Sequence, residues 1–293
     1  MTKFLENRKS ERKITKPIVV FYHGNCTDGF TGAWVAWKKF GNKAEYIGYT
    51  YDDFVPNLKG KEIYTIDMTF EDPVLTERLT RNNKHLTSID HHVSNKERTL
   101  ATYKPLYALN HSGCTLAWQY FFPQKKVPRF LLLVEDMDLW RQKITGGQDL
   151  YNYLDLVDFN FKIYDKIIKD FENSKKRKQI LDAGKLLSRY ENRMIARHIS
   201  RYAKLVRFAG HKVYAINSTD DASETGDRLY NLLPPFSIIW REIKDGQVIV
   251  SLRGDGSVDT SKIAGKYGGG GHRNSSGFVL PSLKQLPWKD AKQ

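Results

Sequence analysis

The stretch HLTSIDHH, residues 85–92, joins a short apolar segment to three consecutive titratable residues. The cluster from Leu86 to Ile89 has the length and composition of a buried strand and ends in an aspartate. A second run, from Glu62 to Ile66, ends in the same way in Asp67. The two runs predict neighbouring strands of a parallel sheet with acidic side chains at their carboxyl ends.

A third predicted strand lies upstream and is followed by a helix. Residues Ile18 to Tyr22 are apolar, the polar loop HGNCTDG follows, and the segment after Gly29 has helical spacing as far as Gly41. Ligands of open parallel sheets bind at the carboxyl ends of the strands. We therefore expect an α/β domain over residues 17–160, in which the side chains that meet at this edge are His23, Asp28, Asp67 and Asp90.

The rest of this domain and the segment after it are expected to be largely helical. Ser112 is a candidate N-cap, and the segment from Pro128 to Trp140 carries Asp136 and Asp138 beside an apolar run. Residues 161–207 hold 14 Lys or Arg against five acids with helical spacing of apolar residues. They predict a basic helical linker at 161–209, whose charge we interpret first as a solvated helix face.

The C-terminal part predicts a second, smaller domain. Apolar runs at 212–217, 236–241 and 247–252 indicate strands, so residues 210–293 are expected to form a mixed β-sheet domain with helices. Residues 1–16 form a basic tail without the apolar segment of a signal peptide. No apolar run approaches a membrane span, so we expect a cytoplasmic protein without a membrane partner.

Composition narrows the classes of partner and site. The net charge of +14 over 293 residues suits a polyanionic partner such as nucleic acid. Cys26 and Cys114 are the two cysteines, which excludes a disulfide framework and a cysteine-rich zinc site. Nothing in the composition opposes a homodimer.

The triplet of Asp90, His91 and His92 is the densest titratable cluster. A neutral imidazole binds divalent metals through one nitrogen, and a nearby carboxylate orients the ring through the other. Taken alone, the triplet is equally well explained by surface histidines. The aspartates predicted at the same sheet edge favour a mixed site for Mn²⁺, Mg²⁺ or Zn²⁺.

A glycine-rich segment near the C-terminus is the second distinctive feature. The sequence YGGGGHRNSSGF spans residues 267–278. Consecutive glycines let backbone N–H groups approach an anion, and a neighbouring histidine and arginine add charged donors. A tight hairpin is the alternative explanation. The residues of this predicted phosphate clamp are Gly269, Gly270, Gly271, His272 and Arg273, with Arg253 as a second guanidinium.

In order and content these motifs resemble the DHH phosphoesterase family. The His and Asp loop at 23–29, Asp67, the Asp90 triplet and the Asp136 segment follow in the family's order, and residues 250–278 are similar to its associated substrate-binding domain with a GGGH stretch. The resemblance covers nearly the whole chain. It implies a parallel-sheet DHH catalytic domain at 17–160 and a C-terminal substrate-binding domain at 210–293.

The resemblance also implies residue roles. Two divalent ions, usually Mn²⁺ with Mg²⁺ as the alternative, would share Asp67 and activate the attacking water. Asp90 would orient His91, and His92 would contact the scissile phosphate or lie just behind the ligands. The implied metal ligands are His23, Asp28, Asp67, His91 and Asp136, the last preferred over Asp138. The implied substrate ligands are Arg253, Gly269, Gly270, Gly271, His272 and Arg273.

The first loop departs from the family's pattern. It holds one aspartate, Asp28, where the family usually has two, so the missing ligand could be Cys26, Asn25 or His111. The expected activity is hydrolysis of short single-stranded oligonucleotides or dinucleotides to nucleoside monophosphates. The alternatives are a cyclic dinucleotide or 3′-phosphonucleotide hydrolase, and a catalytically weakened nucleic-acid or nucleotide binding module.

Overall fold

The protein divides into two compact units. The computed structural model describes residues 14–50, 53–219 and 222–291. One unit extends to Ser188 and the other begins at Arg189, within a single long helix, α8 (Ser174–Tyr202). Each unit has its own sheet and its own buried core, and each is described by itself below.

The first unit is built on a parallel sheet. Its five strands lie in the order β2-β1-β3-β4-β5, and every neighbouring pair is parallel. Tyr22 pairs with Ile66, and Ile66 pairs with Ile89, so three strands end at the same edge. The strands are β1 (Ile18–His23), β2 (Ala44–Tyr49), β3 (Glu62–Ile66), β4 (His85–Asp90) and β5 (Leu106–Tyr107).

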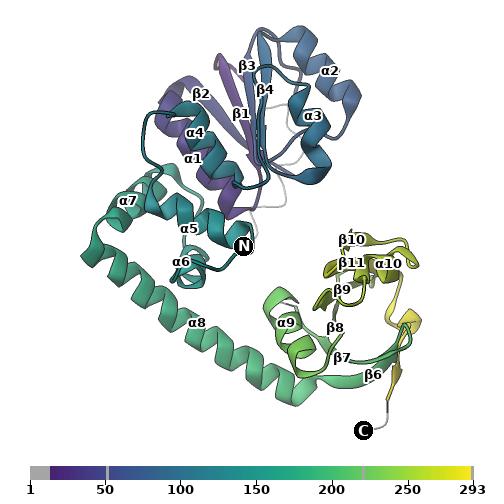
Figure 1. Ribbon diagram of the computed structural model, residues 1–293. Coiled ribbons are helices and arrows are strands. Elements are labelled where there is room, and N and C mark those ends of the chain that lie inside the picture. The colour runs from purple at the N-terminus through teal and green to yellow at the C-terminus, as the bar shows by residue number, and fades with distance from the viewer. Residues whose placement is uncertain (1–13, 51–52, 220–221, 292–293) are drawn as a thin grey trace. The chain divides into compact units, whose positions relative to one another are not determined.

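Helices cover both faces of this sheet, with α1 and α4 on one face and α2 and α3 on the other (Figure 1). The core of this unit has two parts, one on each face of the sheet, and successive residues of β1 point into different parts. Val20 packs on the α1 side and Phe21 on the α2 side. The helices are α1 (Thr27–Phe40), α2 (Pro73–Asn82), α3 (Lys96–Leu100), α4 (Gly113–Phe121), α5 (Arg129–Asp138), α6 (Gly147–Leu154) and α7 (Phe161–Glu172). Short 3₁₀ turns occur at Gly41–Lys43 and Val93–Asn95.

The second unit holds a mixed sheet of seven strands in the order β10-β11-β9-β8-β7-β6-β12. Only the β7–β8 pair is parallel among the described strands of this sheet. Its strands are β6 (Lys204–Phe208), β7 (His211–Asn217), β8 (Phe236–Glu242), β9 (Val248–Gly254), β10 (Gly270–His272), β11 (Ser275–Leu280) and β12 (Lys289–Asp290). The helical segments here are α9 (Ala222–Leu232), α10 (Thr260–Gly265) and a 3₁₀ turn at Leu283–Gln285.

The predicted fold class is confirmed: a parallel α/β unit is followed by helices and a smaller mixed sheet. The strand predicted from Glu62 to Ile66 has those bounds, and the helix predicted to stop at Gly41 ends at Phe40, with Gly41 at a positive φ of 54°. None of the described helices is long and apolar enough to cross a membrane.

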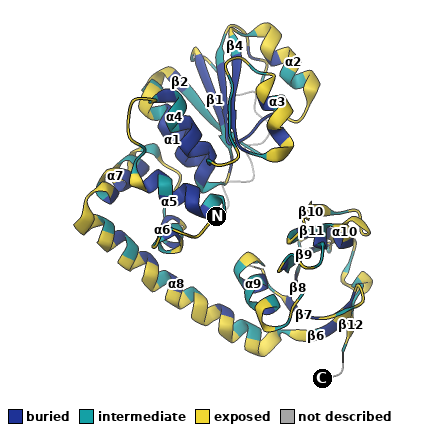
Figure 2. Ribbon diagram, viewed as in Figure 1, coloured by how far each residue is buried: buried dark blue, intermediate teal, exposed yellow. Residues whose placement is uncertain are grey.

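The predicted linker at 161–209 needs correction. Helix α7 buries Tyr164, Ile167 and Phe171 in the core of the first unit, so it is part of that unit. At the other end, residues 204–208 form β6 instead of a helix and pair with β7. This strand buries Val206 and Phe208 on one face. Helix α8 remains exposed along most of its length (Figure 2).

Of the predicted tail at 1–16, residues 1–13 lie outside the described residues. The last part of the predicted tail contacts the first unit: Ile14 packs against the core on the α2 side, and the Lys16 ammonium donates to the Ala44 carbonyl at 3.0 Å.

Candidate metal centre

Asp67 lies at the centre of the cluster at the carboxyl edge of the parallel sheet. It follows β3 directly, is only 2% exposed, and has a φ of 60°. Its backbone N–H donates to the Ile89 carbonyl at 2.9 Å. This hydrogen bond to the neighbouring strand β4 holds Asp67 in its left-handed conformation. A non-glycine residue in this conformation is strained, and such strain concentrates at functional sites.

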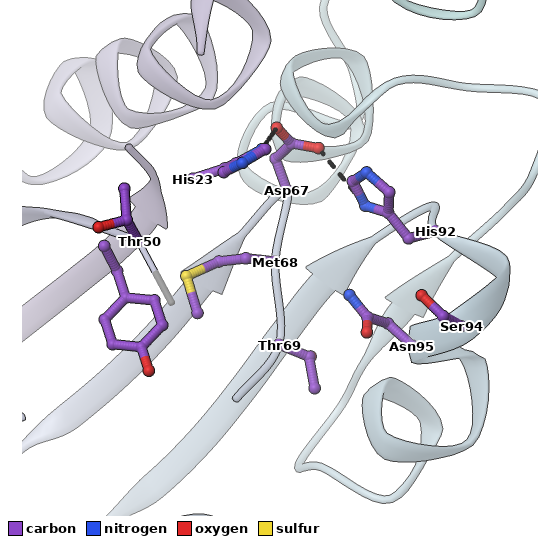
Figure 3. A pocket seen from close by; sticks show the side chains of 9 residues that line it. His23, Thr50, Asp67, Met68, Thr69, His92, Ser94 and Asn95 are labelled. Carbon is purple, nitrogen blue, oxygen red and sulfur yellow. Dashed lines mark hydrogen bonds and ion pairs between the residues drawn. The ribbon is translucent and has the colours of Figure 1, made fainter. Parts of the chain in front are cut away.

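The two carboxylate oxygens of Asp67 face different partners. Oδ2 lies 3.3 Å from His23 Nδ1 and 3.7 Å from Cys26 Sγ, whereas Oδ1 lies 3.1 Å from His91 Nε2. His92 Nδ1 is 3.8 Å from Oδ1, so Asp67 lies between His23 and His92 (Figure 3). Asp67 can therefore serve two groups of ligands at once.

Asp28, His91 and Asp138 form the second group, with their ligand atoms all within 4.8 Å of one another. The Asp28 carboxylate is fully buried and accepts from Ser112 Oγ at 2.6 Å and from the Cys114 N–H at 3.2 Å. Asp138 ends α5, and its Oδ2 lies 3.4 Å from His91 Nε2. That oxygen is buried and has no hydrogen-bond partner among the described residues.

The preference for Asp136 over Asp138 is wrong in this structure. Asp136 Oδ2 accepts the Ile144 N–H at 2.8 Å and thereby fixes the chain after α5. Asp136 belongs to none of the ligand groups found among the described residues. Residues two apart on a helix point about 200° apart, so only one of the pair can face the cluster.

Asp90 supports a different histidine from the predicted one. Its Oδ1 lies 2.7 Å from His92 Nδ1 and accepts the His91 backbone N–H at 2.7 Å. Asn95 Nδ2 donates to the other oxygen at 2.7 Å. Asp90 therefore orients the ring of His92, and it holds His91 through the backbone alone.

Of the three candidates for the missing loop ligand, Cys26 is the one that the structure places in the cluster. Its sulfur groups with His23 and Asp67. Burial, with the charges of Asp67 and Asp28, raises the pKa of the Cys26 thiol. His111 lies elsewhere, with its Nδ1 2.9 Å from Glu135 Oε2. Asn25 contributes a left-handed turn at φ 57°.

Gly113 is a site residue that the sequence reasoning missed. A Cβ at this position would lie 2.5 Å from Asp67 Cβ and 2.8 Å from Asp28 Oδ2, so only glycine lets the start of α4 approach the two aspartates. The predicted side-chain cap by Ser112 is absent, because its hydroxyl donates to Asp28 instead. A glycine after a candidate cap is the signal that was available.

The buried acids and histidines perturb one another. Burial, then the Asp28 and Asp67 charges, raises the pKa of Asp138 to about 8. Burial and the Asp67 charge raise the pKa of Asp28 to about 6. For Asp67, burial acts upward, but hydrogen bonds from His23 and His91 outweigh it and lower the pKa to about 2. For His91, burial acts downward, but Asp67 and the other acids raise the pKa to about 9.

This donor set fits divalent cations. The carboxylates of Asp28, Asp67 and Asp138 converge with the imidazoles of His23 and His91, and one Asp138 oxygen lacks a hydrogen bond among the described residues. Oxygen and imidazole donors suit Mn²⁺, Mg²⁺ and Zn²⁺. A cation would replace the protons that the raised pKa values of Asp138 and His91 retain.

Metal affinity should therefore depend on pH. Asp138 and His91 hold protons at neutral pH because their pKa values are about 8 and about 9. Protons compete with the cation, so we expect Mn²⁺ to bind at least about tenfold more tightly at pH 8 than at pH 6, with release of protons. Calorimetry in buffers of different ionisation enthalpy measures both quantities. Equal affinity at the two pH values without proton release would contradict this coupling.

A cavity of about 130 Å³ opens beside Asp67 (Figure 3). Its lining includes His23, Asp67 and His92, and the remainder consists of uncharged polar, aromatic and apolar side chains. These further lining residues are Tyr49, Thr50, Met68, Thr69, Ser94 and Asn95. The cavity can hold part of a ligand whose reacting atom lies at the aspartate.

In the second unit, the glycine-rich segment forms the hairpin of β10 and β11. A Cβ at Gly269 would lie 2.1 Å from the Gly277 carbonyl oxygen, and Gly268 and Gly271 have φ values of 75° and 131°. The hairpin thus explains three of the four glycines. Gly270 has open space around its Cβ position, so its backbone is accessible.

The predicted substrate ligands of this unit are in part held by the protein. Arg253 Nε and Nη2 lie 3.4 and 3.3 Å from Ser223 Oγ, and Nη1 donates to the Leu252 carbonyl. Arg273 Nε donates to the Gly256 carbonyl at 2.7 Å. His272 is exposed on β10. Gly269 and Gly271 are needed by the hairpin, which leaves Gly270, His272 and the free guanidinium nitrogens for a ligand.

Residues 206–288 match the DHHA1 domain, and they contain most of β6, all of β7 to β11 and the glycine-rich hairpin. This match supports a member of the DHH family. The uncharacterized protein R106 of Acanthamoeba polyphaga mimivirus is 26% identical to this chain over 291 residues, which cover 91% of this chain and 68% of the viral one.

The chain aligns with solved structures of low sequence identity. The pGpG-specific phosphodiesterase PggH from Vibrio cholerae is 14% identical, with a TM-score of 0.50 over 92% of this chain and 94% of that chain. RecJ from Thermus thermophilus, solved in complex with Mn²⁺, is 11% identical with a TM-score of 0.43, over 90% of this chain and 49% of RecJ.

Proposed function

We propose that this chain is a DHH-family, metal-dependent phosphodiesterase that hydrolyses short oligonucleotides or dinucleotides to nucleoside monophosphates. The observation that carries the proposal is the position of Asp67, with one oxygen toward His23 and Cys26 and the other toward His91. A carboxylate between two ligand groups is the arrangement that a two-cation site requires.

Two divalent cations, Mn²⁺ in the first place and Mg²⁺ as the alternative, would occupy this cluster. One would be held by Asp28, Asp67, His91 and Asp138, and the other by His23 and Asp67, with Cys26 beside them. When bound, such ions neutralise phosphate charge and lower the pKa of water.

The protein's own side chains then have separate tasks. Asp90 fixes the ring of His92, whose side chain is 42% exposed and lines the cavity, so His92 can donate to a phosphate oxygen. The cavity beside it would hold the part of the substrate next to the scissile phosphate. In the second unit, Gly270, His272 and Arg273 would bind a further phosphate or sugar.

Nucleic acid is supported as the substrate class by two observations. The net charge of +14 favours polyanions. The description of PggH as a pGpG-specific phosphodiesterase supports a dinucleotide for a protein of similar fold. We therefore place a linear 5′-phosphorylated dinucleotide first among the substrates to test.

The deciding experiment incubates the purified chain with Mn²⁺ and a substrate panel, with chelator-treated protein as the control. The panel contains a 5′-phosphorylated dinucleotide, a cyclic dinucleotide and a 3′-phosphonucleotide, and products are separated by chromatography. We expect nucleoside monophosphates from the dinucleotide, and loss of turnover after chelation that Mn²⁺ restores. Turnover of the cyclic compound or the 3′-phosphonucleotide alone would replace the proposed substrate, and tight binding without turnover would favour a binding module.

A further inference from the structure

Helix α8 carries four arginines in a row within the second unit. Arg189, Arg193, Arg197 and Arg201 lie four residues apart, and all four are exposed. We call them the arginine row. With a rise of about 1.5 Å per residue, neighbouring members are about 6 Å apart along the axis and the row is about 18 Å long.

The row lies on the helix face that the unit leaves free. Ile195 is buried, and Ile199 packs against the small core formed with Leu229 of α9. His198 Nε2 lies 2.8 Å from the Asn217 carbonyl oxygen, which holds the same face on β7. At about 100° per residue, the four arginines are centred on the side opposite Ile195. Their guanidinium groups therefore face solvent.

The arginine row also differs from other cations of these helices in its charge balance. Four lysines on α7 and at the start of α8 are paired with acids: Lys166 and Lys176 with Asp170, Lys169 with Asp165, and Lys178 with Asp182. Within the part of the chain that the structure describes, none of the four arginines forms an ion pair. Glu191 lies about 200° around the helix from both Arg189 and Arg193 and is half-buried.

An exposed aromatic ring adjoins the arginine row. Tyr190 is 67% exposed and follows Arg189 on the free face, three residues before Arg193. Guanidinium groups bind phosphates in bidentate fashion and stack on bases, and tyrosine rings stack on unpaired bases. A solvated face that only aids solubility would be expected to mix both signs of charge.

We propose that the arginine row, with Tyr190, is a binding surface for single-stranded nucleic acid that is separate from the metal centre. The row binds the phosphate backbone, and the ring stacks on a base. The choice of nucleic acid as the polyanion rests on the proposed function. An acidic protein segment is the rival partner, and it has no need of the exposed aromatic ring.

The test uses the full chain with the four arginines of the row replaced by glutamine. Binding of a fluorescent single-stranded 12-mer is followed by anisotropy in the presence of chelator, which prevents metal-dependent cleavage. Four lost phosphate contacts should reduce the slope of log affinity against log salt by about 3, and weaken binding at least tenfold near 50 mM salt. Tyr190→Ala should weaken binding without changing the slope.

The matched control replaces Lys166, Lys169, Lys176 and Lys178 with glutamine. It removes the same charge from paired positions and should leave slope and affinity nearly unchanged. Equal losses of 12-mer affinity in the arginine variant and the lysine variant would overturn the proposal. It would also be overturned if the arginine variant lost affinity for a polyglutamate peptide as strongly as for the 12-mer. Dinucleotide hydrolysis distinguishes the arginine-row proposal from the proposed function. The row variant should retain wild-type kcat/KM for the dinucleotide. If the wild-type protein binds the 12-mer through the row but does not hydrolyse dinucleotides, only the proposed function is refuted.

Discussion

Asp67→Asn should lower kcat/KM for a 5′-phosphorylated dinucleotide by at least about 10³-fold, because the change removes the carboxylate charge that both ligand groups share. Asparagine keeps the size of the side chain, and it retains one oxygen toward either His23 or His91 but not toward both. The fold should persist, since the strand ends around this position are held by backbone pairs such as Ile66 with Ile89. Initial rates at saturating Mn²⁺ and the midpoint of thermal unfolding measure the two effects.

Glu71→Gln is the control for this substitution. It removes one negative charge from an exposed position four residues further along the chain, outside the ligand groups of the described residues. Its kcat/KM should equal that of the wild-type protein. An Asp67→Asn protein with undiminished turnover would refute the proposal that this carboxylate is shared between two cations.

Comparison of Asp138→Ala with Asp136→Ala should separate effects on Mn²⁺ affinity from effects on stability. Asp138→Ala removes a carboxylate that lies 3.4 Å from His91 Nε2 and lacks a hydrogen bond among the described residues. Since loss of even an outer partner of a metal ligand costs 10–100-fold in affinity, we expect Mn²⁺ affinity to fall at least about 100-fold. The metal-free protein should unfold at the same temperature or higher, because the change removes a buried polar oxygen that lacks a hydrogen bond among the described residues.

Asp136→Ala should have the opposite effects, with lower stability and a smaller change in Mn²⁺ affinity. It leaves the partly buried Ile144 N–H without its acceptor, which costs up to about 1–3 kcal/mol of the free energy of unfolding. Calorimetric titration with Mn²⁺ and thermal unfolding of both variants provide the comparison. A larger loss of Mn²⁺ affinity in Asp136→Ala than in Asp138→Ala would restore the assignment that sequence reasoning preferred.

The sheet edge of the site could be predicted from sequence because strand ends are local signals. Apolar runs that stop at His23, Asp67 and Asp90 indicate three strands, and parallel strands bring such ends to one edge. The family resemblance supplied the order of the motifs. The structure brings together every predicted metal ligand except Asp136.

The remaining errors come from directions that spacing alone does not determine. Asp136 and Asp138 are both near the end of α5, and which of them faces the sheet depends on how that helix packs. The partner of the Asp90 carboxylate depends on the path of the chain after β4, which turns the His92 ring toward it. Gly113 matters only because α4 approaches Asp67, a contact between segments distant in sequence.

Strand β6 was missed for a related reason. Residues 204–208 alternate as a strand does, but they follow a basic helix directly and carry two more cations, Lys204 and Arg207. The strand is stabilised by its pairing with β7, which begins only at His211. A five-residue pattern is too short to separate strand from helix without that pairing.

The most direct test of the two-cation account is anomalous scattering from crystals grown with Mn²⁺, with data collected at the manganese edge. We predict two peaks, both within ligand distance of the Asp67 carboxylate, one beside His23 and the other beside His91 and Asp138. A map with no peak at Asp67, or with a single peak that only one of its oxygens contacts, would contradict the account.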